Sequence, residues 1–346
     1  MKKILHITES LGGGVATAMQ GYLQSTPQHW HFLLAAAREG THDKMGWLQG
    51  FAGHYELPRS LSPAVKTIRK VYDDIKPDWV HLHSSYAGAY GRMAMLPRNR
   101  VVYTPHCYAF ERRDVSKLKR WYYMLAEQLL CIGGGATAAV SPRELELAQK
   151  MLIAQHTILL PNSPVIPENI RELRRGHKRG EKLRIAMVGR LSPQKDPTFF
   201  LETVNLAKER DVPAEFVWLG GGDAAWEKKM RAAGVEVSGW MPHEQLLAKL
   251  AGCDIYYHTA AWESCPMSIL EASHLGLLLV CRDTPAIASL PVQPIVPSVK
   301  AAVDSFTQMA WGESLDTSPF AAINDVLNKN YNETTQRDAL LDLYGD

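Results

Sequence analysis

The sequence predicts an α/β protein with two doubly wound parallel-sheet domains, and three observations lead to this prediction. Short β-rich apolar runs alternate with helical patterns along the chain, which is typical of parallel sheets covered by helices. The length of 346 residues corresponds to about two domains of ordinary size. The alternation stops in residues 164–182, which are rich in Pro, Arg, Glu and Gly, and then begins again.

The expected strands are short runs of apolar and β-branched residues between turn residues. They are residues 3–8, 31–37, 55–57, 79–83, 101–104, 136–140 and 157–160 in the first half, and 183–189, 215–219, 235–237, 254–258 and 278–281 in the second. We expect a first domain over residues 1–170, a linker over 171–182, a second domain over 183–325 and an amphipathic C-terminal helix within 326–346. In two such domains a ligand binds near the carboxyl ends of the strands.

The composition is that of a globular protein without a membrane span. Hydrophobic residues make up 46% of the chain and charged residues 21%. No apolar run reaches the ~18 residues that span a bilayer, and the first apolar run is too short for a signal peptide. The five cysteines are scattered and form no C-x-x-C pair, which indicates reduced thiols. We therefore expect a cytoplasmic protein.

Two carboxylates in the second half, Glu263 and Glu271, stand eight residues apart. Pro266 suits the beginning of a helix, and a helix over about residues 266–273 would place Glu271 in its body and Glu263 in the preceding loop. Unpaired amides at that helix end would suit a phosphate, namely those of Cys265, Met267 and Ser268. Taken alone, the spacing also fits a surface helix with two solvated glutamates.

A second candidate phosphate site follows the expected strand at residues 183–189. Gly189 lets the turn pass close to a ligand, and Arg190 and Lys195 bring two positive charges to the strand's end. Paired cations at such a position suit a diphosphate. Solvated surface charges are the alternative.

Three consecutive glycines, Gly12, Gly13 and Gly14, lie between the first expected strand and a helical pattern. They would let the backbone approach a phosphate or an acceptor group, although a tight turn between a strand and a helix explains them equally well. A dinucleotide fingerprint fits poorly, because its third glycine position is occupied by Thr17.

The order and spacing of these motifs resemble the retaining glycosyltransferases of the GT-B fold, in particular family 4. Residues 263–271 are similar to the family's E-x7-E signature, with Ser264 where glycine is common, and residues 189–195 are similar to its G-R-L-x-x-x-K element. The resemblance implies that Glu263 contacts the donor sugar and Glu271 the ribose hydroxyls. It also implies that Arg190 and Lys195 neutralise the leaving nucleoside diphosphate.

Further segments resemble the same family. Gly239, Trp240 and Met241 are similar to its base-binding turn, and the glycine triplet is similar to its acceptor-side loop. His106, in T-P-H, is similar to a histidine that reaches the donor sugar, whereas the histidines of the strand at 79–83 fit a structural role. The resemblance implies two Rossmann-like domains facing each other across a cleft, with the C-terminal helix returning to the first domain.

We therefore expect a retaining glycosyltransferase that moves a sugar from a nucleotide-diphosphate donor, preferably a UDP-sugar, to a glycan or polyprenyl-diphosphate-linked acceptor in bacterial surface polysaccharide biosynthesis. No Asp-x-Asp motif lies near a strand end, so Arg190, Lys195 and the helix end would take the place of Mg²⁺, and we expect neither a cofactor nor a metal. A nucleotide-sugar epimerase of the same fold and a non-catalytic nucleotide-sugar binding module are the alternatives.

A basic and aromatic stretch at residues 112–124 suggests contact with an anionic membrane at the inner face of the cytoplasmic membrane. Residues 1–170 contain 19 Lys+Arg and 13 Asp+Glu, a charge of +6, whereas the remainder contains 19 and 23, a charge of −4. A solvated helix with a buried aromatic face fits equally well, and nothing else in the chain favours nucleic acid. The residues expected to contact the membrane are Arg112, Arg113, Lys117, Lys119 and Arg120.

Overall fold

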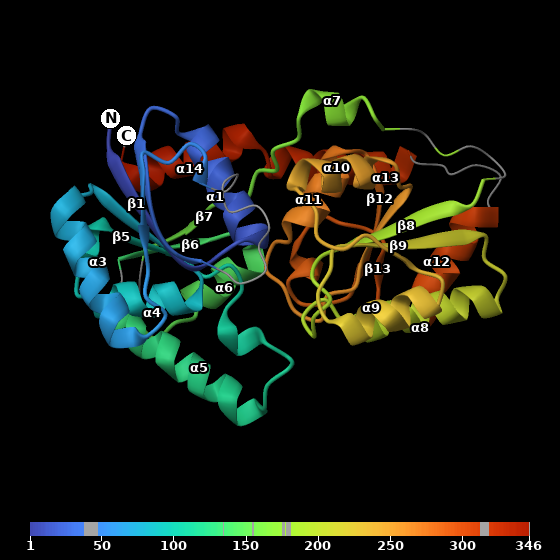
Figure 1. Ribbon diagram of the computed structural model, residues 1–346, viewed down its shortest axis with the longest axis horizontal. Coiled ribbons are helices and arrows are strands. Elements are labelled where there is room, and N and C mark those ends of the chain that lie inside the picture. Colours follow the sequence, from blue (N-terminus) through green and yellow to red (C-terminus); the bar gives the residue numbers. More distant parts are fainter. Residues whose placement is uncertain are drawn as a thin grey trace. The chain divides into compact units, whose positions relative to one another are not determined.

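The computed structural model describes residues 1–37, 48–133, 135–153, 156–174, 177, 181–311 and 318–345. The chain forms two compact units, each built on its own parallel sheet (Figure 1). Unit 1 comprises Met1–Pro164 and Tyr331–Asp346, and unit 2 comprises Val165–Asn330. The sequence-based division lay at residues 170 and 326, and one helical turn, α7 (Glu168–Arg171), ends at the first residue of the expected linker.

Within the described part of unit 1, seven strands form a parallel sheet in the order β3-β2-β1-β4-β5-β6-β7. The strands are β1 (Lys3–Leu11), β2 (Trp30–Ala37), β3 (Gly53–Glu56), β4 (Trp79–His83), β5 (Val101–Thr104), β6 (Ala136–Ala139) and β7 (His156–Leu159). The helices are α1 (Gly13–Ser25), α3 (Leu61–Ile75), α4 (Ser85–Met93), α5 (Lys117–Leu130), α6 (Pro142–Gln149) and α14 (Glu333–Tyr344), with short 3₁₀ turns at Arg98–Arg100, Ala109–Glu111 and Cys131–Gly133.

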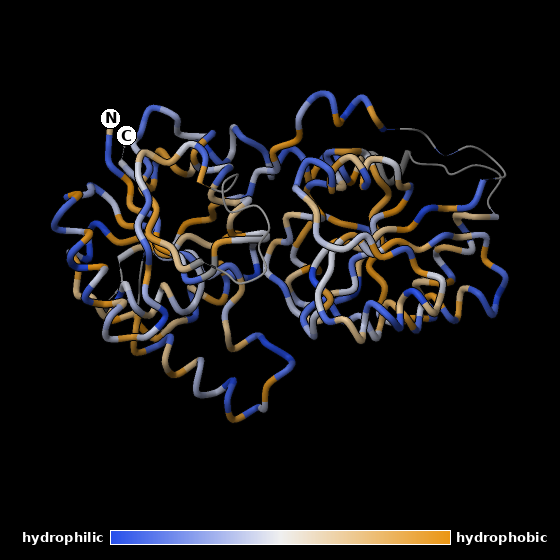
Figure 2. Tube along the Cα trace, viewed as in Figure 1, coloured by the Kyte–Doolittle hydropathy of each residue, from blue (hydrophilic) through white to orange (hydrophobic). Residues whose placement is uncertain are grey.

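The two faces of this sheet differ, because successive side chains of a strand point to opposite sides. Leu5 and Ile7 of β1 belong to the apolar core under α3 and α4, and Figure 2 shows the strands as apolar segments inside a more polar surface. His6 lies between them in sequence and faces the side covered by α1 and α14. The C-terminal helix α14 packs on α1, and the side chain of Trp79 donates a hydrogen bond to the carbonyl oxygen of Tyr344 over 2.8 Å.

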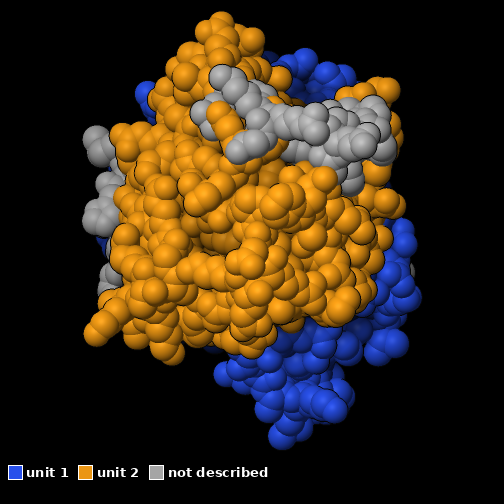
Figure 3. Space-filling model, turned by 90° about the vertical axis from the view of Figure 1, so that its right-hand side faces the viewer, with its two compact units in different colours: residues 1–164, 331–346 blue, residues 165–330 orange. Residues whose placement is uncertain are grey.

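Within the described part of unit 2, six parallel strands have the order β10-β9-β8-β11-β12-β13. They are β8 (Leu183–Val188), β9 (Ala214–Leu219), β10 (Glu236–Val237), β11 (Ile255–His258), β12 (Leu278–Arg282) and β13 (Ile295–Val296). The remaining helices are α8 (Pro197–Glu209), α9 (Ala224–Ala232), α10 (His243–Ala251), α11 (Met267–His274), α12 (Val299–Trp311) and α13 (Ser318–Asn330), with a 3₁₀ turn at Ile287–Ser289. Figure 3 colours the two units by residue range.

An aromatic cluster forms much of the core between the unit 2 sheet and the helices α8 and α12. The ring of Phe200 lies edge-on to Trp218 with centroids 5.1 Å apart, and Tyr257 meets Phe306 at 5.2 Å. Among the described helices of the chain, none is both long and apolar enough to cross a membrane. The two sheets confirm the predicted α/β architecture, whereas β13 was not predicted.

Each sheet has a point where the strand order reverses, between β1 and β4 in unit 1 and between β8 and β11 in unit 2. Loops that leave neighbouring strands in opposite directions leave a crevice at such a point, and α/β proteins bind ligands there. Gly12 follows β1, and Gly189 follows β8. The residues singled out from the sequence therefore begin at the reversal points of both sheets.

Candidate active site

The turn after β8 has a backbone that requires glycine. Gly189 has a φ of 146° and Gly220, in the turn after β9, a φ of 143°. A Cβ atom on Gly220 would lie 2.2 Å from the carbonyl oxygen of Gly189, so the two turns touch through their backbones. The same carbonyl accepts a hydrogen bond from the indole of Trp218 over 2.8 Å. This contact fixes the position from which Arg190 projects.

Lys195 and Glu263 form an ion pair between the loop after β8 and the loop after β11. Their side chains are only 16% and 13% exposed, so they are not the solvated surface charges of the alternative interpretation. The hydroxyl of Thr259 donates to the carbonyl oxygen of Lys195 over 2.7 Å, and the amide of Ala261 donates to Gln194 over 2.9 Å. The two loops are thereby tied together at the reversal point of the unit 2 sheet.

Helix α11 begins one residue later than predicted. Pro266 occupies its N-cap position, and no side chain caps this helix end. Cys265, Met267 and Ser268 surround this helix start, as the sequence predicted. The hydroxyl of Ser268 is 2.7 Å from that of Tyr256, whose oxygen is 3.0 Å from His258 Nδ1, so a buried polar row supports the first turn from below. The partial positive charge of a helix end here is suited to an anion.

Glu271 lies in the body of α11, as predicted, and has a partner that the sequence did not reveal. His243 Nε2, at the first residue of α10, is 2.8 Å from Glu271 Oε1, and the carboxylate side chain is only 4% exposed. Burial alone would lower the pKa of His243, but the charge of Glu271 and its hydrogen bond outweigh burial and raise that pKa. The two glutamates of the E-x7-E pattern therefore have separate basic partners, Lys195 and His243.

The predicted base-binding turn lies next to the phosphate candidates. Gly239 has a φ of 71°, and its carbonyl oxygen accepts a hydrogen bond from Ser238. The half-exposed ring of Trp240 has its centroid 5.9 Å from the guanidinium carbon of Arg190, and Met241 beside it is partly buried. Within unit 2, contacts therefore join Lys195 to Glu263 and Arg190 to Trp240.

In unit 1, His106 lies in a strained turn after β5. His106 and Cys107 have φ values of 51° and 91°. The buried carboxylate of Glu144 accepts from the amide of Cys107 over 2.7 Å and from that of Val140 over 2.9 Å, which holds this turn in place. Burial lowers the pKa of His106 to about 3. Glu144 was not recognised from the sequence, because its role depends on a contact with a distant loop.

The glycine triplet forms the beginning of α1. Gly12 is the N-cap residue with a φ of 150°, Gly13 has a φ of 59°, and Gly14 lies inside the helix. A Cβ atom on Gly13 would meet nothing within 4 Å, so its positive φ, and not crowding, calls for glycine. Gly12 and Gly13 therefore have conformational reasons to be glycine, with or without a ligand.

The five basic residues of the expected membrane contact differ in their surroundings. Arg112 forms an ion pair with Asp114 over 2.7 Å, and Arg120 donates to the carbonyl oxygen of Phe110 over 2.8 Å. These two cations therefore have partners within the protein. The other three, Arg113, Lys117 and Lys119, are exposed.

Comparisons with known proteins identify the family to which each unit is similar. Residues 6–163 match the family model of the glycosyl transferase 4-like domain, and residues 182–305 match that of glycosyl transferases group 1. The chain is similar to an uncharacterized 41.2 kDa protein in the cps region of Klebsiella pneumoniae, with 25% identity over 303 residues that cover 83% of this chain and 82% of that protein.

A second relative has a described activity. The chain is similar to the UDP-Gal:alpha-D-GlcNAc-diphosphoundecaprenol alpha-1,3-galactosyltransferase of Escherichia coli, with 27% identity over 247 residues. The matched residues cover 63% of this chain and 62% of that enzyme. Among solved structures, Anabaena HepE in complex with UDP and glucose has the same fold, with a TM-score of 0.77, 14% identity and 100% of both chains covered. Since the two family models together span most of both units, the chain belongs to the glycosyltransferases of the group 1 and family 4-like type, enzymes with the GT-B fold.

Proposed function

We propose that this enzyme is a retaining, metal-independent glycosyltransferase that uses a UDP-sugar as donor. The observation that carries the proposal is the grouping, within unit 2, of Arg190, the Lys195–Glu263 pair and the uncapped start of α11 at the sheet's reversal point. Arg190, Lys195 and the helix end are suited to a diphosphate. UDP is supported by the galactosyltransferase relative and by HepE, which bind or use UDP compounds.

In the proposed reaction the bond between the sugar's anomeric carbon and the diphosphate oxygen breaks, and its electron pair goes to the diphosphate. The acceptor hydroxyl forms the new bond to the anomeric carbon on the face that the diphosphate leaves, and its proton passes to the departing phosphate oxygen. Arg190, Lys195 and the amides at the start of α11 stabilise the charge that develops there. Glu263 would contact the sugar, and Glu271 with His243 would hold the ribose hydroxyls.

Metal independence rests on the same groups. Arg190, Lys195 of the Lys195–Glu263 pair and a helix end place positive groups where a leaving diphosphate would need them, in the role that a metal ion would otherwise have. We therefore assign this enzyme no cofactor.

The test is incubation of the wild-type enzyme with a panel of nucleotide sugars, with and without acceptor, followed by separation of the products. Release of free UDP with transfer or slow hydrolysis of the sugar is the expected result. A changed sugar still attached to its nucleotide would instead identify an epimerase. Binding without turnover of any donor would identify a binding module.

For the acceptor, we propose a polyprenyl-diphosphate-linked glycan of bacterial surface polysaccharide biosynthesis, reached from the inner face of the cytoplasmic membrane. The E. coli relative is named for a diphosphoundecaprenol-linked acceptor, and the Klebsiella relative for a cps region. The acceptor side would be unit 1, with the glycine loop at the start of α1 as one contact.

Helix α5 supports a membrane contact by its apolar side chains more than by its charges. At the edge of unit 1 (Figure 1), it exposes one stripe with spacings of three and four residues, and its opposite face is anchored by the buried ion pair of Glu127 with Arg92 at 2.8 Å. Leu118 is 75% exposed and Trp121 and Tyr122 61% and 62%. The stripe consists of Leu118, Trp121, Tyr122, Leu125 and Leu129. Arg113, Lys117 and Lys119 beside it complement an anionic surface.

The membrane proposal is tested by co-sedimentation with anionic vesicles across a salt series. Each of the three exposed cations contributes about 1 kcal/mol near such a surface, so changing Arg113, Lys117 and Lys119 to Gln should weaken binding about a hundredfold. Changing Lys66, Lys70 and Lys182, which are also exposed, is the matched control and should have little effect. Wild-type protein that stays in the supernatant at low salt would contradict the membrane contact.

A further inference from the structure

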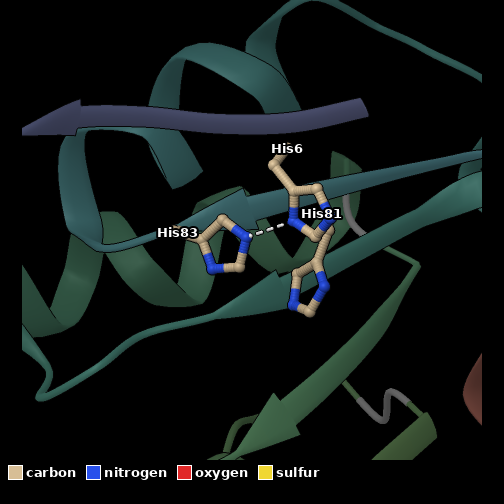
Figure 4. Close-up of side chains that lie close together, drawn as sticks. All are labelled: His6, His81 and His83. Atoms are coloured by element: carbon tan, nitrogen blue, oxygen red, sulfur yellow. Dashed lines mark hydrogen bonds between the residues drawn. The ribbon is translucent and has the colours of Figure 1, made fainter. Parts of the chain in front are cut away.

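A row of histidines crosses the face of the unit 1 sheet that α1 and α14 cover. His6, His31, His81 and His83 are almost fully buried, and His106 lies half-buried at the end of the row. Figure 4 shows three of them, with His6 and His83 joined by a hydrogen bond. Because these rings are buried on neighbouring strands, their nitrogens need hydrogen-bond partners within the protein.

Four of these rings form one continuous chain of hydrogen bonds. His31 Nδ1 is 2.9 Å from His6 Nε2, His6 Nδ1 is 2.9 Å from His83 Nε2, and His83 Nδ1 is 3.2 Å from His106 Nε2. The strand registers explain the path: His31 lies opposite Ile4, and His83 lies opposite Thr8. Each step to the next strand therefore moves two residues toward the carboxyl edge, so the chain is a diagonal that ends at His106.

At one end of this chain of rings, the two groups that face His31 Nε2 act only as hydrogen-bond acceptors. His31 Nε2 lies 3.1 Å from the carbonyl oxygen of Thr26 and 3.3 Å from its hydroxyl oxygen. The hydroxyl donates its own proton to the carbonyl oxygen of Tyr22 over 2.8 Å, so it offers only a lone pair to His31. His31 Nε2 must therefore carry a proton, because a bare nitrogen facing two acceptors would make no hydrogen bond.

All four rings are neutral at pH 7. Burial lowers the pKa of His6 and His83 far below the ordinary value, with further lowering from neighbouring histidines. Burial also lowers the pKa of His31 to about 4 and that of His106 to about 3. A neutral imidazole has one N–H and one bare nitrogen, so a proton on His31 Nε2 leaves Nδ1 as an acceptor.

We propose that this chain fixes the tautomer of His106, so that His106 carries its proton on Nε2 and presents a bare Nδ1 to its ligand. His6 Nε2 donates to His31, His83 Nε2 donates to His6, and His106 Nε2 donates to His83. Within the described residues no group bonds to His106 Nδ1, which lies on the ring's other side. His31, His6 and His83 are thus positioning residues that act through His106.

The tautomer determines which chemical group His106 can bind. A bare nitrogen accepts a hydrogen bond from a hydroxyl, whereas phosphate oxygens at neutral pH only accept. His106 is therefore suited to a hydroxyl of the carbohydrate substrate and unsuited to its diphosphate. The identity of that hydroxyl as part of a carbohydrate rests on the proposed function, but the tautomer itself does not.

A metal ion is the competing explanation for the same histidines. Ring nitrogens of His6, His81 and His83 lie within 4.8 Å of one another. However, His81 already uses Nδ1 with the hydroxyl of Tyr344 at 2.9 Å and Nε2 with that of Thr104 at 2.7 Å. A zinc ion would have to replace these hydrogen bonds, so the hydrogen-bonded chain is the better account.

The decisive experiment is ¹⁵N NMR of the ligand-free protein labelled in its histidine rings, which distinguishes a protonated from a bare ring nitrogen. The expected spectrum shows His6, His31, His83 and His106 all protonated at Nε2, with about a tenfold preference, since the reversed chain would lose the hydrogen bond from His31 Nε2 to the carbonyl oxygen of Thr26. A His106 protonated at Nδ1 would overturn the proposal. Neither result depends on any transferase activity.

Two matched variants test the coupling along the chain. His31→Asn keeps an oxygen near the position of Nδ1 that accepts from His6, whereas His31→Leu of similar size does not. We expect the wild-type signature at His106 in His31→Asn, and a second signature with a proton on His106 Nδ1 in His31→Leu. The kcat/KM for the donor should also be about tenfold lower in His31→Leu than in His31→Asn. An unchanged His106 signature in a folded His31→Leu protein would show that the rings are not coupled.

Added Zn²⁺ provides the last arm. If the histidines form the hydrogen-bonded chain, one equivalent of Zn²⁺ should leave the ring signals of His6, His81 and His83 unchanged. Zinc that is retained after desalting by the wild-type protein and lost in His83→Asn, with shifted ring signals, would replace the tautomer proposal with a metal site.

Discussion

Replacement of Glu271 by Gln tests the pairing that the sequence did not reveal. The variant keeps the size of the side chain and an oxygen that can accept from His243, but it removes the carboxylate charge. In the wild-type protein the charge of Glu271 and its hydrogen bond raise the pKa of His243 against the effect of burial. Without that charge burial remains, so the pKa of His243 should fall from above to below the ordinary value of 6.5.

The structure also sets the size of the effect on donor binding. Glu271 is 4% exposed, so its hydrogen bonds are formed away from water. A hydrogen bond to a charged group contributes about 1.5–3 kcal/mol, and each 1.4 kcal/mol corresponds to about tenfold in affinity. Loss of one such bond to a ribose hydroxyl should therefore weaken UDP binding about 10- to 100-fold, whatever sugar the donor carries.

The pH dependence of stability should change sign with the substitution. In the wild-type protein, His243 has a raised pKa, so its contribution is complete below 6.5 and is lost as the pH rises through the folded value. In Glu271→Gln, the contribution should instead be lost as the pH falls below 6.5. NMR titration of the His243 ring and calorimetry of UDP binding measure both effects. An unchanged His243 pKa, or equal UDP affinity, would refute the assigned role of Glu271.

Three further predictions concern charge. Arg190→Ala and Lys195→Met should each lower donor kcat/KM about 10²- to 10³-fold, as the loss of one charge stabiliser does, whereas the exposed Lys300→Met should leave it unchanged. Donor turnover should persist in EDTA, and a strict need for Mg²⁺ in the chemical step would remove the diphosphate site from the account. Because burial lowers the pKa values of His31 and His106 to about 4 and about 3, these neutral rings stabilise unit 1 fully above pH 6.5. The free energy of unfolding should therefore decrease as the pH falls from 6.5 toward 4, by up to about 1.4 kcal/mol per pH unit for each histidine. Urea unfolding at a series of pH values measures this free energy. A free energy of unfolding that does not change with pH would contradict neutral rings.

The parts predicted correctly from the sequence are those that local pattern determines. The strand β4 and the strand β5 have the expected bounds, because each apolar run ends at a polar or turn residue. The helix expected over 266–273 begins one residue later, at Met267, since Pro266 is its N-cap.

The contacts that the sequence could not reveal mostly join residues far apart in the chain. His243 meets Glu271 only because α10 and α11 lie side by side, and no local pattern marks that contact. The histidine chain depends on the register of β2, β1 and β4, which composition does not determine. One local contact was also overlooked, because Arg112 donates its hydrogen bonds to Asp114, two residues away.

The stereochemistry of donor cleavage in EDTA shows whether the enzyme is both retaining and metal-independent. A UDP-α-sugar, taken from the donor panel as the one that is turned over, is hydrolysed in an NMR tube with water as acceptor, and the first anomer is recorded before it mutarotates. A retaining, metal-independent enzyme predicts that the α-anomer appears first and UDP accumulates with it. A β-anomer as the first product, or no cleavage until Mg²⁺ is added, would contradict the account.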